Sequence, residues 1–403
     1  MFNLEKFINK FVTRREDSLF KTDLETYATK LNHEVKNTSV LVIGGAGTIG
    51  SSFVKAILAF KPKKLYIVDI NENGLTELTR DLRSSRNVVV PQEYKTYPID
   101  FGSKVFMKML NQEGPFDIVA NFAAHKHVRS EKDHVSIIAM IENNVIKAKG
   151  LLDQLVMKPP KHFFCVSTDK AANPVNVMGA SKKLMEEVIL AYSSKMKITT
   201  ARFANVAFSN GSLPFGFLFR LQKKQPLSAP LDVKRYFVSP EESGQLCMIA
   251  CLLGNSGEIF YPKLSANQML TFSSIAEYFL LENGYQPFYC QSEKEAKQMA
   301  FNMGDKSSGP YPVYFFKSET SGEKPYEEFF TSNEQLDVDR FAQLGVIQNA
   351  PKQSIEIIDS MFEKLFDLFD KDLITKTEVV KLLKDIIPSF NHIETGKSLD
   401  QKM

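Results

Sequence analysis

An acid and two amines lie close together in the sequence, at Asp169, Lys170 and Lys182. Asp169 and Lys170 come just after an apolar run at 163–166, which has the composition of a buried strand, and a segment with helical periodicity follows at 179–193. The Asp-Lys pair is therefore predicted at the carboxyl end of a strand, where ligands bind in open α/β sheets. An acid, a base and a cation near one point suit proton transfer on a bound substrate.

A glycine-rich loop lies further toward the amino end, directly after one apolar strand and directly before a helix. Three spaced glycines allow a tight turn, close approach of the backbone to a pyrophosphate and close packing of the helix. The amino end of that helix then faces the phosphates. The loop predicts a dinucleotide-binding site with contacts from Gly44, Gly47, Thr48, Ile49 and Gly50.

A carboxylate follows the loop at Asp69, at the end of the second predicted strand. There it can accept both ribose hydroxyls, with Asn71 beside it, and it favours NAD because a carboxylate repels a 2'-phosphate. The alternative is that Asp69 caps the turn that contains Asn71 and Asn73, which leaves NADP open.

Alternating strands and helices are expected to position these groups. Apolar runs predict strands at 39–43, 64–69, 94–99, 116–121, 162–167 and 198–203, with helical segments between them. This order predicts an α/β fold with a doubly wound parallel (Rossmann) sheet. We divide the chain into a helical extension at 1–37, an NAD(P)-binding domain at 38–210 to which a strand near 257–262 returns, a mainly substrate-binding domain at 211–340 and a second helical extension at 341–403.

Composition narrows the function class. The 403 residues carry a net charge of only +3 without a block of Lys or Arg, which argues against a nucleic-acid partner. The four cysteines lack the paired spacing of metal sites, and we interpret them as reduced core residues. No apolar run approaches the roughly 20 residues of a membrane span, and the amino end lacks the core of a signal peptide. We expect a soluble, cytoplasmic protein.

The two ends of the chain give weaker signals. The apolar positions of the first extension could form a membrane-surface helix, but their mixed charges favour packing or an oligomer contact, and we expect a homo-oligomer. Beyond 262, a strand is predicted at 313–316 and a charged, aromatic stretch lies at 326–328. Helices are predicted near 354–369 and 377–387, and a Thr375-x-x-Glu378 capping box introduces the second.

The motifs resemble those of a known family. The spacing Gly44-x-x-Gly47-x-x-Gly50 is similar to that of extended short-chain dehydrogenases/reductases. The run at 167–182 closely resembles the UDP-N-acetylglucosamine 4,6-dehydratases of bacterial surface-sugar synthesis, and its Thr-Asp-Lys part is the most specific. Further matches at 202–206, 210–212, 235–237 and 257–260 extend the resemblance from about 38 to 265.

The resemblance implies a reaction that begins with oxidation at C4 of the sugar, continues with loss of water across C5 and C6, and ends with return of the hydride to C6. NAD would be tightly bound and regenerated in each turnover. By resemblance, Lys170 is the base at C5, Asp169 is the acid for the 6-hydroxyl, Thr168 binds the sugar near O4, and Lys182 holds the nicotinamide ribose.

One catalytic position departs from the common pattern, because Met178 replaces the Tyr of Tyr-x-x-x-Lys. A thioether cannot accept the proton of the 4-hydroxyl. The sequence resembles the subset of these dehydratases that carry Met here, which leaves the base at O4 unassigned among Asp169, Lys170 and a water relayed to Lys182. Our hypothesis is that Asp169 takes the O4 proton and later delivers a proton to O6.

The resemblance also assigns binding residues, and no metal site is predicted from the alternate histidines at 125 and 127. We expect Arg235 to neutralise the diphosphate, with a rim salt bridge as its alternative role. The expected cofactor contacts are Asp100, Phe101, Ala123, Ala124, Lys126, Asn144, Ser167 and Lys182. The expected substrate contacts are Lys126, His127, Asn205, Asn210, Leu213 and Arg235, with 213–225 closing over the uridine.

Two other functions stay open. A nucleotide-sugar 4-epimerase uses the same fold and a transient oxidation without loss of water, and the pair Asp169-Lys170 argues against it. A dinucleotide-binding regulator without turnover is supported only by Met178. The stereochemistry at C5 and the configuration of the hexosamine are left open.

Overall fold

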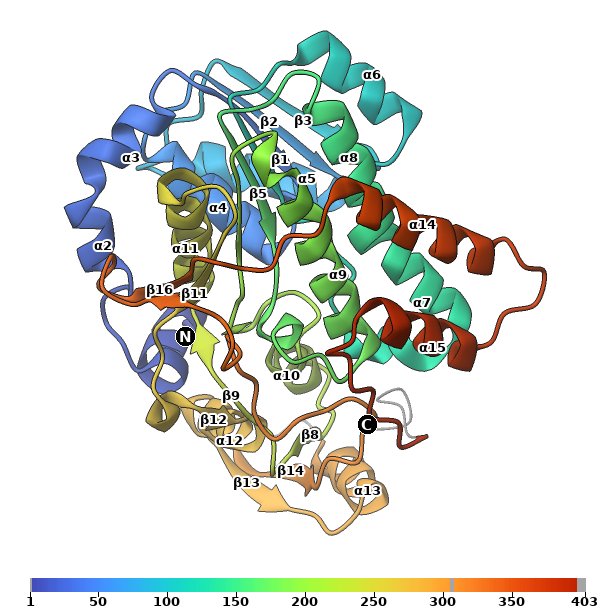
Figure 1. Cartoon of the computed structure of the whole chain (residues 1–403). Helices are drawn as coiled ribbons and strands as arrows, with labels where there is room; N and C mark the ends of the chain where they lie inside the picture. Colours follow the sequence, from blue (N-terminus) through green and yellow to red (C-terminus); the bar gives the residue numbers. More distant parts are fainter. Residues whose placement is uncertain (1, 305–307, 397–403) are drawn as a thin grey trace.

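The computed structural model describes residues 2–304 and 308–396, and a large sheet lies at its centre (Figure 1). Nine strands lie in the order β15-β16-β11-β6-β5-β4-β1-β2-β3. The seven from β11 to β3 pair in parallel, and β16 and β15 extend the sheet with antiparallel pairings. The strands are β1 (Ser39–Ile43), β2 (Lys64–Asp69), β3 (Glu93–Pro98), β4 (Ile118–Asn121), β5 (His162–Val166), β6 (Ile198–Ala201), β11 (Glu258–Pro262), β15 (Leu336–Asp337) and β16 (Leu344–Ile347).

The predicted doubly wound sheet is confirmed. The ends of β1 to β6 differ from the predicted strand ends by at most two residues. Helices cover both faces: α4 and α11 pack together on one face, and α8 and α9 lie on the other, with α14 against α9 (Figure 1). The helices just named are α4 (Thr48–Leu58), α8 (Lys147–Leu155), α9 (Val177–Ala191), α11 (Pro240–Leu253) and α14 (Ile355–Phe369). Three more helices connect the strands of this sheet: α5 (Glu72–Ser84), α6 (Lys104–Glu113) and α7 (His134–Ile141).

A smaller unit has its own apolar core, and its helices are α10 (Leu213–Gln222), α12 (Phe272–Glu282) and α13 (Glu293–Met303). Its three parallel strands are β8 (Leu227–Pro230), β13 (Tyr285–Tyr289) and β14 (Gly309–Phe316), and β14 contains the strand predicted at 313–316. The amino-terminal α1 (Leu4–Phe7) and the π-helix Ile8–Thr13 pack on this core. The ring of Phe7 lies edge-on to Phe279, with centroids 6.0 Å apart. Much of the apolar surface of the first extension is therefore covered within the chain itself.

The last described helix returns the chain to the middle of the molecule. α15 (Lys376–Ile386) begins with the predicted capping box of Thr375 and Glu378, and it packs against α7. Beyond it, the backbone amide of Asn391 donates to the Pro174 carbonyl at 3.0 Å, and that of Ile393 donates to the Val175 carbonyl at 3.0 Å. A segment near the end of the described chain thus binds the loop that carries the Asp-Lys pair.

Among the described residues, no helix combines the length and the apolar composition needed to cross a bilayer.

The four cysteines are buried, and none of them forms a disulfide. Burial raises the pKa of the Cys165 thiol to about 11 and that of Cys251 to about 12, so both are neutral core groups.

Candidate active site

The glycine loop lies between β1 and α4 and contains glycines with different roles. Gly44 has a φ of +74°, and a Cβ there would lie 2.5 Å from the Ala123 amide nitrogen. A Cβ on Gly50 would lie 2.3 Å from the Gly44 carbonyl oxygen. A Cβ on Gly47 would meet only the Gly44 oxygen, at 3.4 Å. Packing therefore requires Gly44 and Gly50, whereas Gly47 borders open space at an amino end of α4 that has no side-chain cap.

Asp69 joins the loop to the next turn. One carboxylate oxygen accepts from the Ala46 amide at 2.9 Å, and the other accepts from the Asn71 amide at 2.9 Å. The Asn71 side chain in turn caps α5. Because each carboxylate oxygen has more than one acceptor position, these contacts leave room for ribose hydroxyls. The turn contact and the ribose contact, which the sequence set against each other, are compatible.

The wall opposite the loop is held by Asn144, which lies in the π-helix Glu142–Ile146 between α7 and α8. Its side-chain oxygen accepts from the His125 amide at 2.8 Å, and its amide group donates to the His125 carbonyl at 2.9 Å and to the Ser181 hydroxyl at 3.1 Å. Irregular helical turns of this kind are frequent at functional sites. Asn144 is thus a positioning residue for the loop that contains Ala123 and Ala124.

Asp100 and Phe101 follow β3 at the same edge of the sheet. The Asp100 carboxylate accepts from Lys147 Nζ at 2.5 Å and from the Gly102 amide at 2.8 Å. Phe101 is buried. The predicted adenine contact of Asp100 would therefore share its carboxylate with a lysine that the sequence analysis did not single out.

Asp169 and Lys170 form a compact pair in a short turn after β5. A single Asp169 carboxylate oxygen, Oδ1, accepts from the Thr168 hydroxyl at 2.8 Å, the Lys170 amide at 2.9 Å and Lys170 Nζ at 3.0 Å. The Asp169 side chain is only 4% exposed. The structure therefore brings Thr168, Asp169 and Lys170 together.

A second carboxylate, which the sequence analysis did not assign to the site, lies beside this pair. Glu327 Oε1 is 3.6 Å from Lys170 Nζ and 3.7 Å from Arg235 Nη2. The Glu327 side chain is 2% exposed, and its Oε1 has no hydrogen-bond partner among the described residues. Burial raises the pKa of Glu327, and Asp169 acts in the same direction, whereas Lys170 and Arg235 oppose the shift.

Lys182 and Met178 lie on α9, behind the Asp-Lys pair, and both are buried. Lys182 Nζ donates to the Val166 carbonyl at 2.8 Å, and burial lowers the pKa of this amine. The Ser167 hydroxyl donates to Glu186 at 2.6 Å, so it is already engaged on the protein side. The roles of Lys182 and Ser167 at the cofactor stay predictions.

Glu186 belongs to a buried ionic network under the site. The Arg202 guanidinium binds Glu186 through Nε at 3.0 Å and Nη2 at 2.9 Å, and it binds Glu334 through Nη1 and Nη2 at 2.9 Å each. Arg202 Nη1 also donates to the Phe329 carbonyl at 3.0 Å. The network fixes the segment that carries Glu327 against the end of β5.

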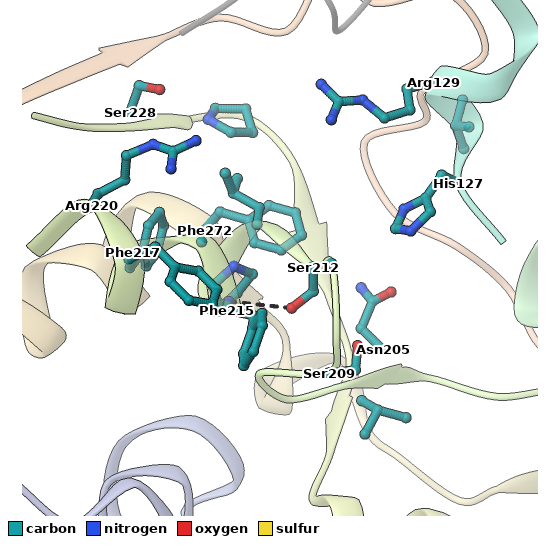
Figure 2. A pocket seen from close by; sticks show the side chains of 18 of the residues that line it. His127, Arg129, Asn205, Ser209, Ser212, Phe215, Phe217, Arg220, Ser228 and Phe272 are labelled. Carbon is teal, nitrogen blue, oxygen red and sulfur yellow. Dashed lines mark hydrogen bonds between the residues drawn. The ribbon is translucent and has the colours of Figure 1, made fainter. Parts of the chain in front are cut away.

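A pocket of about 590 Å³ is bordered by α10 and by the segment after β4 (Figure 2), and Asp169, Lys170 and Glu327 are not among its lining residues. Of the expected substrate contacts, four line it: Lys126, His127, Asn205 and Leu213. Much of α10 lines it as well, including Phe215 and Phe219. Burial lowers the pKa of both Lys126 and His127. Asn210 is not among the lining residues, although Ser209 and Gly211 on either side of it are, and its backbone amide donates to the Thr48 hydroxyl at 2.9 Å.

Arg235 lies outside the pocket lining formed by the described residues. Its guanidinium donates to the backbone carbonyls of Lys234 and Lys324, each at 2.9 Å, and lies within 3.8 Å of Glu323 and Glu327. Arg235 is buried, so these contacts are not the rim salt bridge of the alternative, and the diphosphate role of Arg235 stays a prediction.

Two other arginines line the pocket and were missed. Arg129 and Arg220 extend into it from opposite sides in Figure 2. Arg129 lies in the 3-10 turn Val128–Lys132 and Arg220 on α10. No local motif in the sequence indicates that these two segments meet.

The comparisons place the chain among known proteins. It matches the family described as "Polysaccharide biosynthesis protein" over residues 40–349. A Methanocaldococcus jannaschii protein, "Uncharacterized membrane protein MJ1061", is 30% identical over 363 residues, which cover 87% of this chain and 96% of that protein. The "Probable polysaccharide biosynthesis protein EpsC" of Bacillus subtilis is 28% identical over 80% of this chain but only 50% of its own length. The chain therefore spans about half the length of EpsC.

Named enzymes match a shorter part. The "UDP-N-acetylglucosamine 4,6-dehydratase (inverting)" of Campylobacter jejuni is 26% identical over 56% of this chain and 67% of its own. A "UDP-glucose 4-epimerase" of Rickettsia typhi is 25% identical over 57% of this chain and 67% of its own. The X-ray structure of Pen from Bacillus thuringiensis has a TM-score of 0.62 at 20% identity and covers 87% of this chain and 98% of Pen. This structural likeness concerns the fold.

Proposed function

Because the chain belongs to the family of polysaccharide biosynthesis proteins, we propose that it is a nucleotide-sugar 4,6-dehydratase that acts on UDP-N-acetylglucosamine. The observation that carries the proposal is the contact between the buried Asp169 and the partly buried Lys170 at the carboxyl end of β5. The pair lies on the same sheet edge as the glycine loop, and an epimerase has no need of an acid and a base at C5 and C6. The Campylobacter relative's name supports the same reaction.

The residues present fit a dinucleotide. A Cβ on Gly47 would project into the space bordered by the uncapped amino end of α4, where a pyrophosphate would lie. Asp69 would bind the ribose, and its carboxylate favours NAD. Bound there, the nicotinamide would accept hydride from C4 of the sugar and return it to C6.

The chain's own residues would then move protons. Asp169 takes the proton of the 4-hydroxyl, and Lys170 removes the proton at C5, which the C4 ketone makes acidic. Asp169 delivers a proton to the departing 6-hydroxyl, which leaves as water, and Lys170 returns a proton to C5. The protons balance over one turnover. Arg129 and Arg220 would neutralise the diphosphate from the two sides of the pocket.

Proton NMR of the protein with UDP-N-acetylglucosamine and NAD in deuterated water tests the reaction. A new 6-methyl signal with deuterium at C5 is expected, and its couplings report whether C5 inverts. A changed configuration at C4 without a methyl signal would establish the epimerase, a function that the Rickettsia relative's name supports. Parallel reactions with NADP test the cofactor preference.

A single-turnover experiment tests the assignment at O4. Asp169→Asn is expected to bind NAD and substrate but to form bound NADH much more slowly than the wild type. Formation of NADH at the normal rate would show that another group takes the O4 proton.

A further inference from the structure

We infer that Glu327 is a third acid–base residue of this centre: it accepts a proton from Lys170 and so provides the neutral amine that abstraction at C5 requires. The inference rests on the proposed function. It concerns a residue that the sequence motifs do not include and that reaches the site from a loop far along the chain.

The loop holds Glu327 firmly in place. The neighbouring Phe329 is buried, its carbonyl accepts from Arg202 Nη1 at 3.0 Å, and its ring lies 5.4 Å from that of Tyr236. The adjacent Glu328 accepts from the Asn173 side chain at 2.8 Å. The Glu327 carboxylate, which directly precedes these two anchors, is 2% exposed and lies 3.6 Å from Lys170 Nζ.

The two carboxylates beside Lys170 differ in their hydrogen bonding. Asp169 Oδ1 accepts from three donors, including Lys170 Nζ at 3.0 Å. Glu327 Oε1 accepts from none of the described residues. A buried oxygen without a partner destabilises the charged form of its group. Of the two carboxylates, Glu327 is therefore the one suited to hold a proton at rest.

Charged groups face Glu327 from every element around it. Lys170 and Asp169 come from the turn after β5, Arg235 comes from β9 (Lys234–Arg235) with Nη2 at 3.7 Å, and Lys324 Nζ lies 4.0 Å from Oε2. Burial outweighs the cations and raises the pKa of Glu327. The ammonium of Lys170 is the nearest of these possible proton donors.

Proton transfer between Lys170 and Glu327 leaves the total number of protons on these two residues unchanged. One N–H bond of the Lys170 ammonium breaks and an O–H bond forms on Glu327, which converts an ammonium and a carboxylate into an amine and a carboxyl. The amine takes the C5 proton and becomes an ammonium, whose hydrogens exchange with solvent, and it returns to the amine when it delivers one of them to C5. Asp169 stays available for the exchange between O4 and O6.

The first test needs no turnover. The full chain is compared with Glu327→Gln and with Glu328→Gln, a matched control at the exposed neighbouring position. Infrared spectra are expected to show a protonated-carboxyl band in the wild type and in Glu328→Gln that Glu327→Gln lacks. Persistence of the whole band in Glu327→Gln would overturn the inference. Loss of the band in a protein that never forms a 6-methyl product supports the proton assignment and overturns the dehydratase instead.

The second test is the pH profile of deuterium exchange at C5 of the substrate. In the wild type the proton is shared between Lys170 and Glu327. The fraction of neutral Lys170 and the exchange rate are therefore expected not to change with pH around neutrality. In Glu327→Gln the proton must leave to solvent, so the rate is expected to fall by up to about tenfold for each unit by which the pH is lowered. Glu327→Asp, which restores a carboxylate, should recover the flat profile. A flat profile in Glu327→Gln would refute the transfer.

Discussion

Gly47→Ala separates cofactor binding from folding. Gly47 has φ −72° and ψ 163°, a conformation that alanine adopts without strain. The added Cβ meets only the Gly44 carbonyl oxygen, at 3.4 Å. Reduced freedom of the unfolded chain contributes about 0.4–1 kcal/mol of stability. The poorer N-cap costs about the same amount.

The net change in stability is therefore expected to be within about 1 kcal/mol. An unfolding entropy of about 2.1 cal/mol/K per residue over the 403 residues makes this a shift of about 1 °C in Tm. The methyl group would project to where the pyrophosphate is proposed to lie. We expect at least about a tenfold loss of NAD affinity, or about 1.4 kcal/mol.

Gly50→Ala is the matched control. A Cβ there lies 2.3 Å from the Gly44 oxygen and 2.8 Å from Gly45 Cα, so the backbone itself must move. Such overpacking costs on the order of 1–3 kcal/mol, and Tm should fall by a few degrees. Tm is measured by calorimetry, and NAD binding by titration after bound cofactor has been removed. Gly47→Ala with unchanged affinity would refute the proposed phosphate position, and Gly47→Ala as unstable as Gly50→Ala would refute the packing argument.

Three further changes test other parts of the structure. Arg202→Met leaves Glu186 and Glu334 buried without their cation, which costs about 3–5 kcal/mol; calorimetry should show Tm lower by about 4–6 °C, and an unchanged Tm would contradict the network. Burial raises the pKa of Glu187 from 4.5 to about 7, so the unfolded chain loses its proton first and stability falls as pH rises through this window. Urea unfolding should show Glu187→Gln more stable than the wild type at pH 8, by up to about 3 kcal/mol, and similar to it at pH 4.5; equal stability at pH 8 would contradict the shift. Deletion of 388–403 should lower kcat about tenfold or more with NAD affinity retained, because the Asp-Lys loop loses its backbone contacts; deletion of 397–403 is the control, and equal kcat in both would contradict this role.

The sequence was most informative where structure depends on local pattern. Strand-like patterns predicted β1 to β6, although β3 is mostly polar, and the Thr375 capping box marked the start of α15. The glycine spacing and the Asp-Lys pair stood out because each motif is contiguous. From the sequence alone, these features predicted that the glycine loop and the Asp-Lys pair lie at the same edge of the sheet.

Side chains that reach the site from distant segments could not be found in this way. The stretch at 326–328 showed only charge and aromatic character, and nothing local tied Glu327 to Lys170. Arg129 and Arg220 meet across the pocket because a 3-10 turn and α10 are brought together by tertiary packing. Arg235 was assigned from the motif match at 235–237, but its contacts depend on the distant loop at 323–327.

The backbone pairing of Asn391 and Ile393 with Pro174 and Val175 also has a consequence in time. Translation reaches this segment roughly 200 residues after Lys182, which at about 5–20 residues per second is about 10–40 s of synthesis. The Rossmann strands and the glycine loop have left the ribosome long before then. In a nascent chain, the dinucleotide-binding loop would therefore form early, and the Asp-Lys loop would gain its last backbone contacts at the end of synthesis. Each new molecule would bind its cofactor before it could catalyse the reaction.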